Sequence, residues 1–361
     1  MRFPRQRLVG LAGRAPWLGL LAFLWGCDVG YYAHLARGQL RIAVGCQDVA
    51  DLLARPDTDA GLRQQLGLVV QIRRFAFRHV GLDQSDSYTC FFDTHGQPVS
   101  WNVSASPPDR FQPYLWRFPI IGAAPYKGYF DPERARAEEK RLAAAGYDVL
   151  VGPVSAYSTL GYLADPVLST MLDDPEEALA DLILHELTHG TVYVRGQTDF
   201  NESLATYVGT TGSLEFLAER HGPASAEVAR AAQRRGDAAL FRQFMGSVVA
   251  SLDSLYGSGL PRPEVLRQRQ DVFARAKEAY REVQTRFQVD HHDGFLRWEI
   301  NNARLLSYRR YHRDLDAFER LQARRGSLAS VVAVCRQCAS AADPWACIAA
   351  AAEAGRPGPV P

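Results

Sequence analysis

The residues best suited to chemistry lie in one short run, His185-Glu186-Leu187-Thr188-His189. Two histidines four residues apart lie on the same face of an α-helix, where both imidazoles can bind one metal ion. Glu202 follows in a second run, Asn201-Glu202-Ser203, and offers a carboxylate as a third ligand. The pattern therefore predicts a zinc site made by His185, His189 and Glu202, with one coordination position open for catalysis.

Glu186 is next to the first ligand, and the metal site does not need it as a ligand. Zn²⁺ held by two neutral imidazoles and one carboxylate lowers the pKa of a bound water to roughly 7. Glu186 can take the proton of that water and pass it to a leaving amine. The carbonyl under attack also needs a donor for its oxyanion. Spacing does not choose among the available tyrosines, which are Tyr193, Tyr207, Tyr308 and Tyr311.

A helix is expected to carry the histidine pair. Asp174 is a candidate N-cap, Pro175 suits the first helical position, and Glu177 completes a capping box. Acidic residues in the first turn also favour the positive end of the helix dipole. The helix is expected to run to about Tyr193 or Arg195, so the histidines lie in its second half.

A second helix is expected to bring the third ligand back to the first. Gly196 ends the first helix, and Thr198 or Asp199 can cap the next helix. Glu202 then lies in the first turn of that helix. The intervening residues 190–201 are numerous enough for the chain to turn and place this carboxylate beside the imidazoles.

Other segments predict a mixture of strands and helices. A hairpin is expected from strands at 88–92 and 99–104 around the turn Thr94–Gly96, and a charged helix between Asp131 and Gly146. A further strand is expected at 147–151. The later part of the chain reads as helical, with helices at about 224–255, 262–288 and 297–324.

Short stretches along the chain carry a resemblance to a known family. They are Ile72–Ala76, Ser87-Tyr88, Val99–Val103, Trp116–Pro119, Pro125–Phe130, Gly146–Val149, Ala156–Gly161, Asp165–Leu168, His185–His189 and Phe200–Ser203. On these stretches the chain resembles the bacterial putative aminopeptidase family, predicted zinc metallopeptidases of the zincin type. Asn301–Ala303 together with Tyr311 is similar to a further family stretch. The chain departs from the family at Cys90 and Gly190, and neither is a proposed ligand.

The resemblance implies a site and a fold. Carried over by position, it implies zinc on His185, His189 and Glu202, with Glu186 as catalytic base, and Tyr311 is the candidate second catalytic residue. The implied fold is α+β and zincin-like, with a small sheet over the helix that carries the histidines and a mostly helical C-terminal part. An edge strand of such a sheet can align an extended peptide by backbone pairing. Trp101 and Asn102 are candidates for that edge, and a core tryptophan is the equal alternative.

The first residues predict export and a lipid anchor. Arginines at positions 2, 5, 7 and 14 precede the short apolar stretch Trp17–Gly26, which is about half the length of a membrane-spanning helix. Gly26-Cys27 resembles a lipobox, in which Cys27 is lipidated and becomes the mature N-terminus. Asp28 resembles a signal for retention at the inner membrane. A bacterial, periplasm-facing, lipid-anchored protein of the cell envelope is expected; an ordinary signal peptide or an uncleaved anchor is the alternative.

Composition limits the classes of function. The 361 residues are 47% hydrophobic and 22% charged, and the net charge of +1 gives no indication of nucleic acid or of a strongly charged substrate. The pair His291-His292 is expected in a solvated turn rather than in a second metal site. The predicted divisions are a signal peptide at 1–26, a catalytic α+β domain at 27–220, a helical subdomain at 221–330, and a Cys-containing tail at 331–361 with a disordered end.

The cysteines are consistent with an oxidising compartment. Cys335 and Cys338 have CxxC spacing, but no second pair follows, and Cys347 lies nearby. A structural zinc site would lack a fourth ligand, so a disulfide among these three residues is expected. The pairing of Cys46 and Cys90 stays open.

Together these patterns predict a zinc metallopeptidase with a peptide substrate, in the first place an aminopeptidase. A peptidase or amidase of cell-wall peptides is one alternative, and a non-catalytic envelope lipoprotein with a retained metal site is another. Glu186 argues against the second, because a purely structural site has no use for a base. Exopeptidase and endopeptidase action both stay open, as does the oligomeric state.

Overall fold

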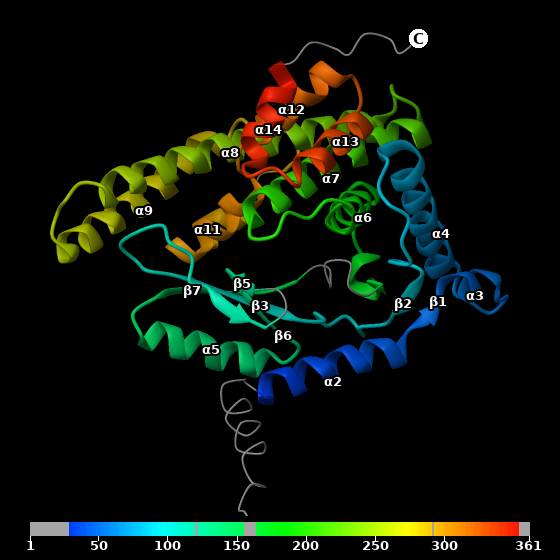
Figure 1. Cartoon of the computed structure of the whole chain (residues 1–361), viewed down its shortest axis with the longest axis horizontal. Coiled ribbons are helices and arrows are strands. Elements are labelled where there is room, and N and C mark those ends of the chain that lie inside the picture. Colours follow the sequence, from blue (N-terminus) through cyan, green and yellow to red (C-terminus); the bar gives the residue numbers. More distant parts are fainter. Residues whose placement is uncertain (1–28, 120–121, 155–163, 291, 354–361) are drawn as a thin grey trace, which may run out of the picture. The chain divides into compact units, whose positions relative to one another are not determined.

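The computed structural model describes residues 29–119, 122–154, 164–290 and 292–353 (Figure 1). The chain divides into two compact units, residues 1–45 and residues 46–361. In the first unit, the described part is helix α2 (Val29–Gly45). Cys27 and the leader lie outside the described residues, so the lipid anchor stays a prediction, as do the boundaries at residues 220 and 330. No helix in the described ranges is both long and apolar enough to cross a membrane.

The second unit contains a three-stranded antiparallel sheet in the order β6 (Lys127–Tyr129), β3 (Trp101–Ser106), β7 (Asp148–Pro153). Helix α5 (Pro132–Ala144) contacts β3 and β7 from one side, and α11 (Asn302–Tyr311) contacts them from the other (Figure 1). The sheet is therefore a layer between helices, and the buried residues of its central strand lie in the second half, Val103–Ser106. The predicted helix at α5 and the predicted strand at β7 are confirmed.

The predicted edge position of Trp101 and Asn102 is wrong. Trp101 is opposite Tyr129 of β6 and also opposite Pro153 of β7, so β3 is the central strand. The backbone of β3 is paired on both sides at this level and offers no free edge to a peptide.

The predicted hairpin at residues 88–104 is also wrong. Its first strand, β2 (Cys90–Phe92), pairs antiparallel with β1 (Gln47–Asp48) and parallel with β8 (Val167–Leu168), and β3 belongs to the other sheet. The turn itself is present, with positive φ angles at His95 and Gly96. The strands separate after it because each finds its partners far away in the sequence. A disulfide between Cys46 and Cys90 connects the start of β1 to β2.

Short elements complete the part of the unit before residue 172. Strands β4 (Trp116–Phe118) and β5 (Gly122–Ala124) form a two-stranded ribbon. The helices there are α3 (Val49–Ala54), α4 (Ala60–Phe75), the π-helical turn η1 (Ala76–Val80) and the 3₁₀ turn η2 (Ser169–Met171).

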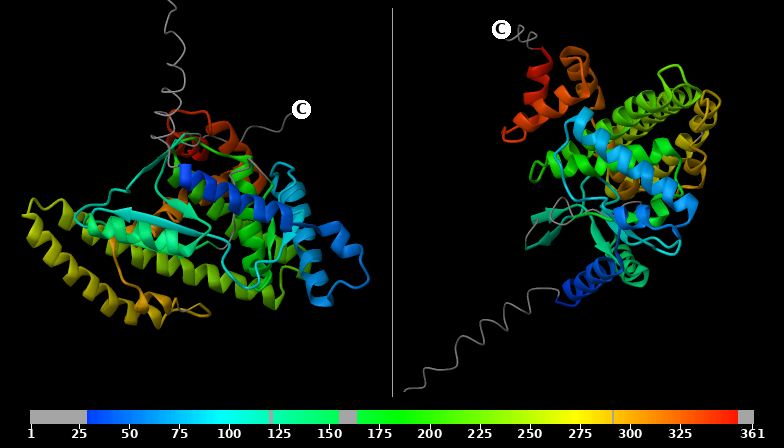
Figure 2. Two further views of the ribbon diagram at one scale, coloured as in Figure 1. Left: turned by 90° about the horizontal axis from the view of Figure 1, so that it is seen from below. Right: turned by 90° about the vertical axis from the view of Figure 1, so that its right-hand side faces the viewer.

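Two long helices, α8 (Ala226–Tyr256) and α9 (Arg262–Gln284), run side by side in the C-terminal half (Figure 2). The single helix predicted at 297–324 is three helices, namely α10 (Gly294–Arg297), α11 and α12 (Leu315–Arg325). Asn301 caps the start of α11 with its side chain. Asp314 interrupts the helical structure before α12 with a left-handed φ of 48°.

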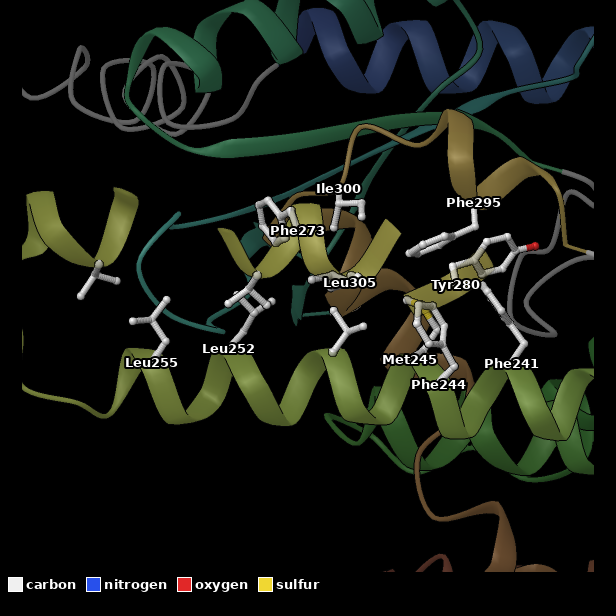
Figure 3. Close-up of a cluster of buried hydrophobic side chains, with 14 of the residues drawn as sticks. Phe241, Phe244, Met245, Leu252, Leu255, Phe273, Tyr280, Phe295, Ile300 and Leu305 are labelled. Atoms are coloured by element: carbon white, nitrogen blue, oxygen red, sulfur yellow. The ribbon is translucent and has the colours of Figure 1, made fainter. Parts of the chain in front are cut away.

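Aromatic side chains hold these helices together (Figure 3). Phe241 and Phe244 of α8 point toward Tyr280 of α9 and Phe295 of α10, and all four are buried. Such a side chain contributes roughly 1.5–3 kcal/mol when fully buried. The ring of His292 stacks on Phe241, 4.3 Å between centroids, and its side chain is only 23% exposed. The prediction of a solvated turn at His292 is therefore wrong, because the ring belongs to this cluster; His291 lies outside the described residues.

The tail predicted at 331–361 is helical as far as it is described. Helices α13 (Leu328–Cys338) and α14 (Pro344–Glu353) pack on α12 and on each other. A disulfide joins Cys338 to Cys347, which confirms the expected bridge among the three C-terminal cysteines. Cys335 is a buried free thiol.

His312 gives this region a pH dependence that can be measured. Burial lowers the pKa of His312 to about 4, and its Nδ1–H donates to the Tyr308 carbonyl at 2.9 Å. Because the folded pKa is below the unfolded value of about 6.5, the stabilisation is complete above pH 6.5 and is lost as the pH falls toward 4. We expect the unfolding free energy to drop by up to roughly 3 kcal/mol over this range from His312 alone. His312→Gln should reduce that slope in urea titrations between pH 4 and 8, and equal slopes would contradict the assignment.

Candidate metal centre

The two predicted ligand-bearing helices are α6 (Glu176–Thr191) and α7 (Thr198–His221), and they pack closely against each other (Figure 1). Helix α6 begins one residue later than expected. Pro175 takes the N-cap position, and neither a cap bond from Asp174 nor a capping box is formed. Glu176 and Glu177 still lie in the first turn, where their charge favours the helix dipole.

Asn201 explains why α6 ends at Thr191 rather than at Tyr193 or Arg195. Its side-chain amide accepts a hydrogen bond from Val194 N at 2.8 Å and donates one to Val194 O at 2.9 Å. These two bonds satisfy an extended connection that cannot also be helical. The buried asparagine therefore fixes the turn that leads into α7, and this is the structural role of the residue before Glu202.

Helix α7 begins at Thr198, and its N-cap position is occupied by Gln197 without a side-chain bond. The predicted caps Thr198 and Asp199 are therefore wrong by one or two positions. Glu202 lies in the second turn of α7 rather than in the first. This extra turn places the carboxylate opposite the end of α6, at the level of both histidines.

Three ligand atoms form a nearly regular triangle. His185 Nε2 and His189 Nε2 are 3.3 Å apart, and Glu202 Oε2 is 3.4 Å from the first and 3.6 Å from the second. Zinc bonds of roughly 2.0–2.2 Å in a tetrahedron give ligand-to-ligand edges of about 3.3–3.6 Å. The three donors therefore fit a zinc ion without rearrangement. In the described part of the chain, this is the group of His, Cys, Asp or Glu residues with metal-binding geometry.

The electrostatics of the triangle favour a cation. His189 and Glu202 are buried, with 5% and 7% of their surfaces exposed. Burial would raise the pKa of Glu202, but hydrogen bonds from both histidines and their charge lower it far below its usual value. Burial would lower the pKa of His189, and the hydrogen bond and charge of Glu202 outweigh this and raise it. A buried, ionised carboxylate beside two imidazoles is a set that a divalent cation satisfies.

Glu186 is outside the triangle and acts on its surroundings through its charge. It contributes to the raised pKa of Tyr88, of Tyr126 and of Tyr311. Each of these hydroxyls is therefore within the range of the Glu186 charge. A free carboxylate in such a position can exchange a proton with a water at the ligands.

Of the four tyrosines named from the sequence, Tyr311 lies at the ligands. Its ring is 6.0 Å from the ring of His185, and the charge of Glu202, followed by burial, raises its pKa well above 10. By contrast, Tyr207 donates its hydroxyl to Gln322 at 2.6 Å, and Tyr308 stacks on His312. Tyr193 is 44% exposed and contributes to the raised pKa of Tyr126.

Sequence spacing missed two further tyrosines. Tyr126 is partly buried, and the loss of hydration followed by the charge of Glu202 raises its pKa far above the usual value. Tyr88 is fully buried in a left-handed conformation, and no described residue bonds its hydroxyl. Burial and then the charge of Glu186 raise its pKa. Both occur in stretches that resemble the family, which was the available signal, but neither has a spacing that relates it to the histidines.

Asp181 lies one turn before His185 on α6 and faces Gly209 of α7. Burial raises its pKa to about 7, and the charge of His185 opposes this. A Cβ at Gly209 would clash with the Asp181 carboxylate and would come within 2.7 Å of its backbone oxygen. The absence of a side chain at residue 209 is therefore what lets α6 approach α7 closely enough for the ligands to meet.

The α+β fold and the buried His-His-Glu triangle define a protein with a candidate metal site between two packed helices. Comparison with known families makes the assignment more specific. The family model described as "Putative aminopeptidase" matches residues 30–344, so the chain belongs to this family. Comparisons with curated proteins and with solved structures found no match.

Gly209→Ala should separate the two helices. We expect a loss of about 1–3 kcal/mol in unfolding free energy from overpacking, together with weaker zinc binding. Gly246→Ala is the matched control, because this glycine lies inside α8 and a Cβ added there would meet no atom within 4 Å, and it should stabilise by about 0.5–1 kcal/mol. Denaturant unfolding and zinc titration against a chelating dye measure both effects. If Gly209→Ala changes neither the unfolding free energy nor the zinc affinity, the spacing between the helices is adjustable.

Glu202→Gln should weaken zinc binding. The substitution keeps the size of the side chain and removes its charge, so we expect a loss of more than roughly 100-fold in affinity, beyond what outer residues of metal sites contribute. Glu215→Gln is the control on the same helix, where the carboxylate accepts from Gln322 instead. The measurement is a competition titration of the purified protein. Unchanged affinity in Glu202→Gln would identify another residue as third ligand.

Proposed function

We propose that this protein is a zinc-dependent peptidase, an aminopeptidase in its primary activity, with Glu186 as general base. The observation that carries the proposal is the triangle of His185 Nε2, His189 Nε2 and Glu202 Oε2, with edges of 3.3, 3.4 and 3.6 Å. Membership of the family named for aminopeptidase activity supports the substrate class. The zincin-like relation between the small sheet and the helix with the histidines is part of this proposal.

The ligand types support zinc over other divalent ions. Two imidazoles and one carboxylate are the donors of catalytic zinc sites, whereas calcium and magnesium prefer sets made of oxygen alone. Three protein ligands also leave a tetrahedral ion one position for water or substrate. A bound zinc ion would supply Lewis acidity for the carbonyl and would lower the pKa of an attacking water to roughly 7.

Glu186 supplies the proton transfers. As a carboxylate on the same helix as both histidines, it accepts a proton from the attacking water and returns it to the amine that leaves. The alternative of a retained metal site without turnover gives no role to this residue. A carboxylate next to a ligand, and not itself a ligand, is well placed to move a proton.

Tyr311 supplies a neutral hydrogen-bond donor. The nearby charge of Glu202 raises its pKa well above 10, so the phenol keeps its proton at neutral pH. A protonated hydroxyl beside the ligands can donate to the oxygen on which charge develops as the carbonyl is attacked. Tyr126 has the same electrostatic character and is the second candidate for this role.

Glu186→Gln should retain zinc and lose turnover. Glutamine keeps the shape of the side chain but cannot take the proton, so kcat on a peptide substrate should fall by about 10²–10⁴-fold. Elemental analysis of the purified protein should still find the metal, which separates loss of base from loss of site. Normal turnover in this variant would remove Glu186 from the mechanism.

Tyr311→Phe should lower kcat by about 10²–10³-fold with little change in KM, the pattern of a donor that acts in the transition state. Tyr308→Phe is the control, because this ring lies one turn earlier on α11 and stacks on His312 away from the ligands. Steady-state kinetics on one peptide substrate compare the two variants. If Tyr126→Phe shows the loss and Tyr311→Phe does not, the donor is Tyr126.

A further inference from the structure

Arg310 is a buried cation to which the protein gives no anion among the described residues. It lies in the last turn of α11 and is 6% exposed. Its guanidinium lies over the ring of Tyr126, 5.4 Å from the centroid, and has no ion pair or side-chain hydrogen bond with any described residue.

Another buried arginine of this protein shows what a structural arginine looks like here. Arg269 is 5% exposed and also lies over an aromatic ring, that of Phe273. Its guanidinium donates to both carboxylate oxygens of Asp148, at 2.9 and 3.1 Å, and to the carbonyl of Pro108. A buried charge normally requires such partners, because contact with an aromatic ring replaces only part of its lost hydration. Arg310 has the ring and lacks the carboxylate.

The guanidinium of Arg310 is also not sealed off from solvent. Elsewhere, Arg63, Arg73, Arg269 and Arg325 each have an Nε that is fully enclosed and unpartnered. No nitrogen of Arg310 is enclosed in this way, although the residue as a whole is buried. Its nitrogens therefore keep some contact with solvent.

Arg310 is next to the candidate metal centre, because its neighbour Tyr311 has its ring 6.0 Å from the ring of His185. Arg310 lies over the Tyr126 ring, and its charge lowers the pKa of Tyr126 and of Tyr311, whereas the charge of Glu202 raises both. Ser203, the neighbour of Glu202, donates its hydroxyl to the Arg310 carbonyl at 3.3 Å, which fixes the end of α11 against α7. The backbone of Arg310 is thus tied to the helix that carries Glu202.

We propose that Arg310 binds a carboxylate of the peptide substrate. This inference rests on the proposed peptidase function and adds a substrate class to it, namely peptides with a negative charge close to the cleaved bond. The charge can be the C-terminal carboxylate of a dipeptide or an acidic side chain, since both present the same two oxygens to a guanidinium fork. The observation that carries it is the unpaired guanidinium of Arg310, a residue only 6% exposed that lies beside the ligand triangle.

Direct binding tests the proposal independently of turnover. Titration calorimetry measures the binding of small probes to zinc-loaded Glu186→Gln, which binds but does not turn over. The acidic probes are Ala-Ala and Ala-Glu amide, and their neutral partners are Ala-Ala amide and Ala-Gln amide. Each acidic probe differs from its neutral partner by the carboxylate alone. We expect one acidic probe to bind at least about tenfold more tightly than its neutral partner. A preference for Ala-Ala identifies the C-terminus as the source of the carboxylate, and a preference for Ala-Glu amide identifies the side chain.

Arg310→Gln in the same background should abolish that preference, and Arg310→Lys should restore part of it. Arg309→Gln is the matched control, because Arg309 is the neighbouring arginine of α11, is 38% exposed and lies 4.0 Å from Asp253. It should leave the preference intact. A carboxylate that binds the metal instead would keep its advantage in Arg310→Gln, and this result would overturn the proposal.

Kinetics with Glu186 present separate the remaining outcomes. If Arg310→Gln loses the preference for acidic probes in KM, the proposal is supported. If instead kcat falls equally on all four probes, Arg310 acts through the tyrosines, and the proposal is overturned. If the protein with Arg310 in place binds acidic and neutral probes equally, the proposal is overturned, even if Arg310→Gln does not fold. If the probes bind with the expected preference but the enzyme cleaves none of them, the carboxylate site stands and the peptidase function fails. If the enzyme cleaves the probes but binds acidic and neutral ones equally, the peptidase function stands and the carboxylate site fails.

Discussion

The close packing of α6 on α7 is the constraint on which the candidate metal centre depends. Its donors come from two helices, so the distances between His185, His189 and Glu202 follow the distance between the helix axes. Glycines at positions 209 and 212 leave room for side chains of α6, because a Cβ at either position would meet Asp181 or Leu184. Ligand distances in metal sites tolerate only about 0.2 Å, so this packing decides whether the triangle fits zinc or merely gathers polar groups.

Charge balance in the centre is local and is not visible in the composition. The whole chain carries a formal charge of +1. Around the ligands, however, the charges of Glu202 and Glu186 raise the pKa of Tyr126 and of Tyr311, and the charge of Arg310 lowers both. The neutral overall balance that argued against a strongly charged substrate therefore says little about this site. What a ligand meets is the arrangement of a few buried groups in a low-dielectric surrounding.

Sequence reasoning found the features whose signals are short in range. His185 and His189 follow from helical periodicity, and Glu202 follows from a short connection to the next helix. The end of α6 was missed because Asn201 bonds back to Val194, a contact that competes with helix formation and has no periodic signature. Pairing of β2 with β1 and β8, and the choice of Cys90 as partner of Cys46, depend on contacts that the local turn at His95 does not indicate.

The surroundings of the ligands could be predicted only in part for the same reason. Tyr311 entered through resemblance to the family rather than through spacing. Tyr88, Tyr126 and Arg310 reach the site because sheets and helices from distant parts of the chain close around it. No pattern in the 361 residues relates these three positions to the histidines. Their electrostatic roles depend on burial, which exists only in the folded protein.

The distribution of the site along the chain has a consequence for the order in which it forms. All three donors lie within residues 185–202, so two helices and one turn suffice to bring them together. Tyr88, Tyr126, Arg310 and Tyr311 come from positions more than 50 residues away on either side, and α11 must dock before the last two arrive. Local contacts form faster than distant ones, because shorter loops are closed at lower entropic cost. During synthesis, a chain that has emerged only to the end of α7 already contains every metal donor and Glu186, while Arg310 and Tyr311 are still to come.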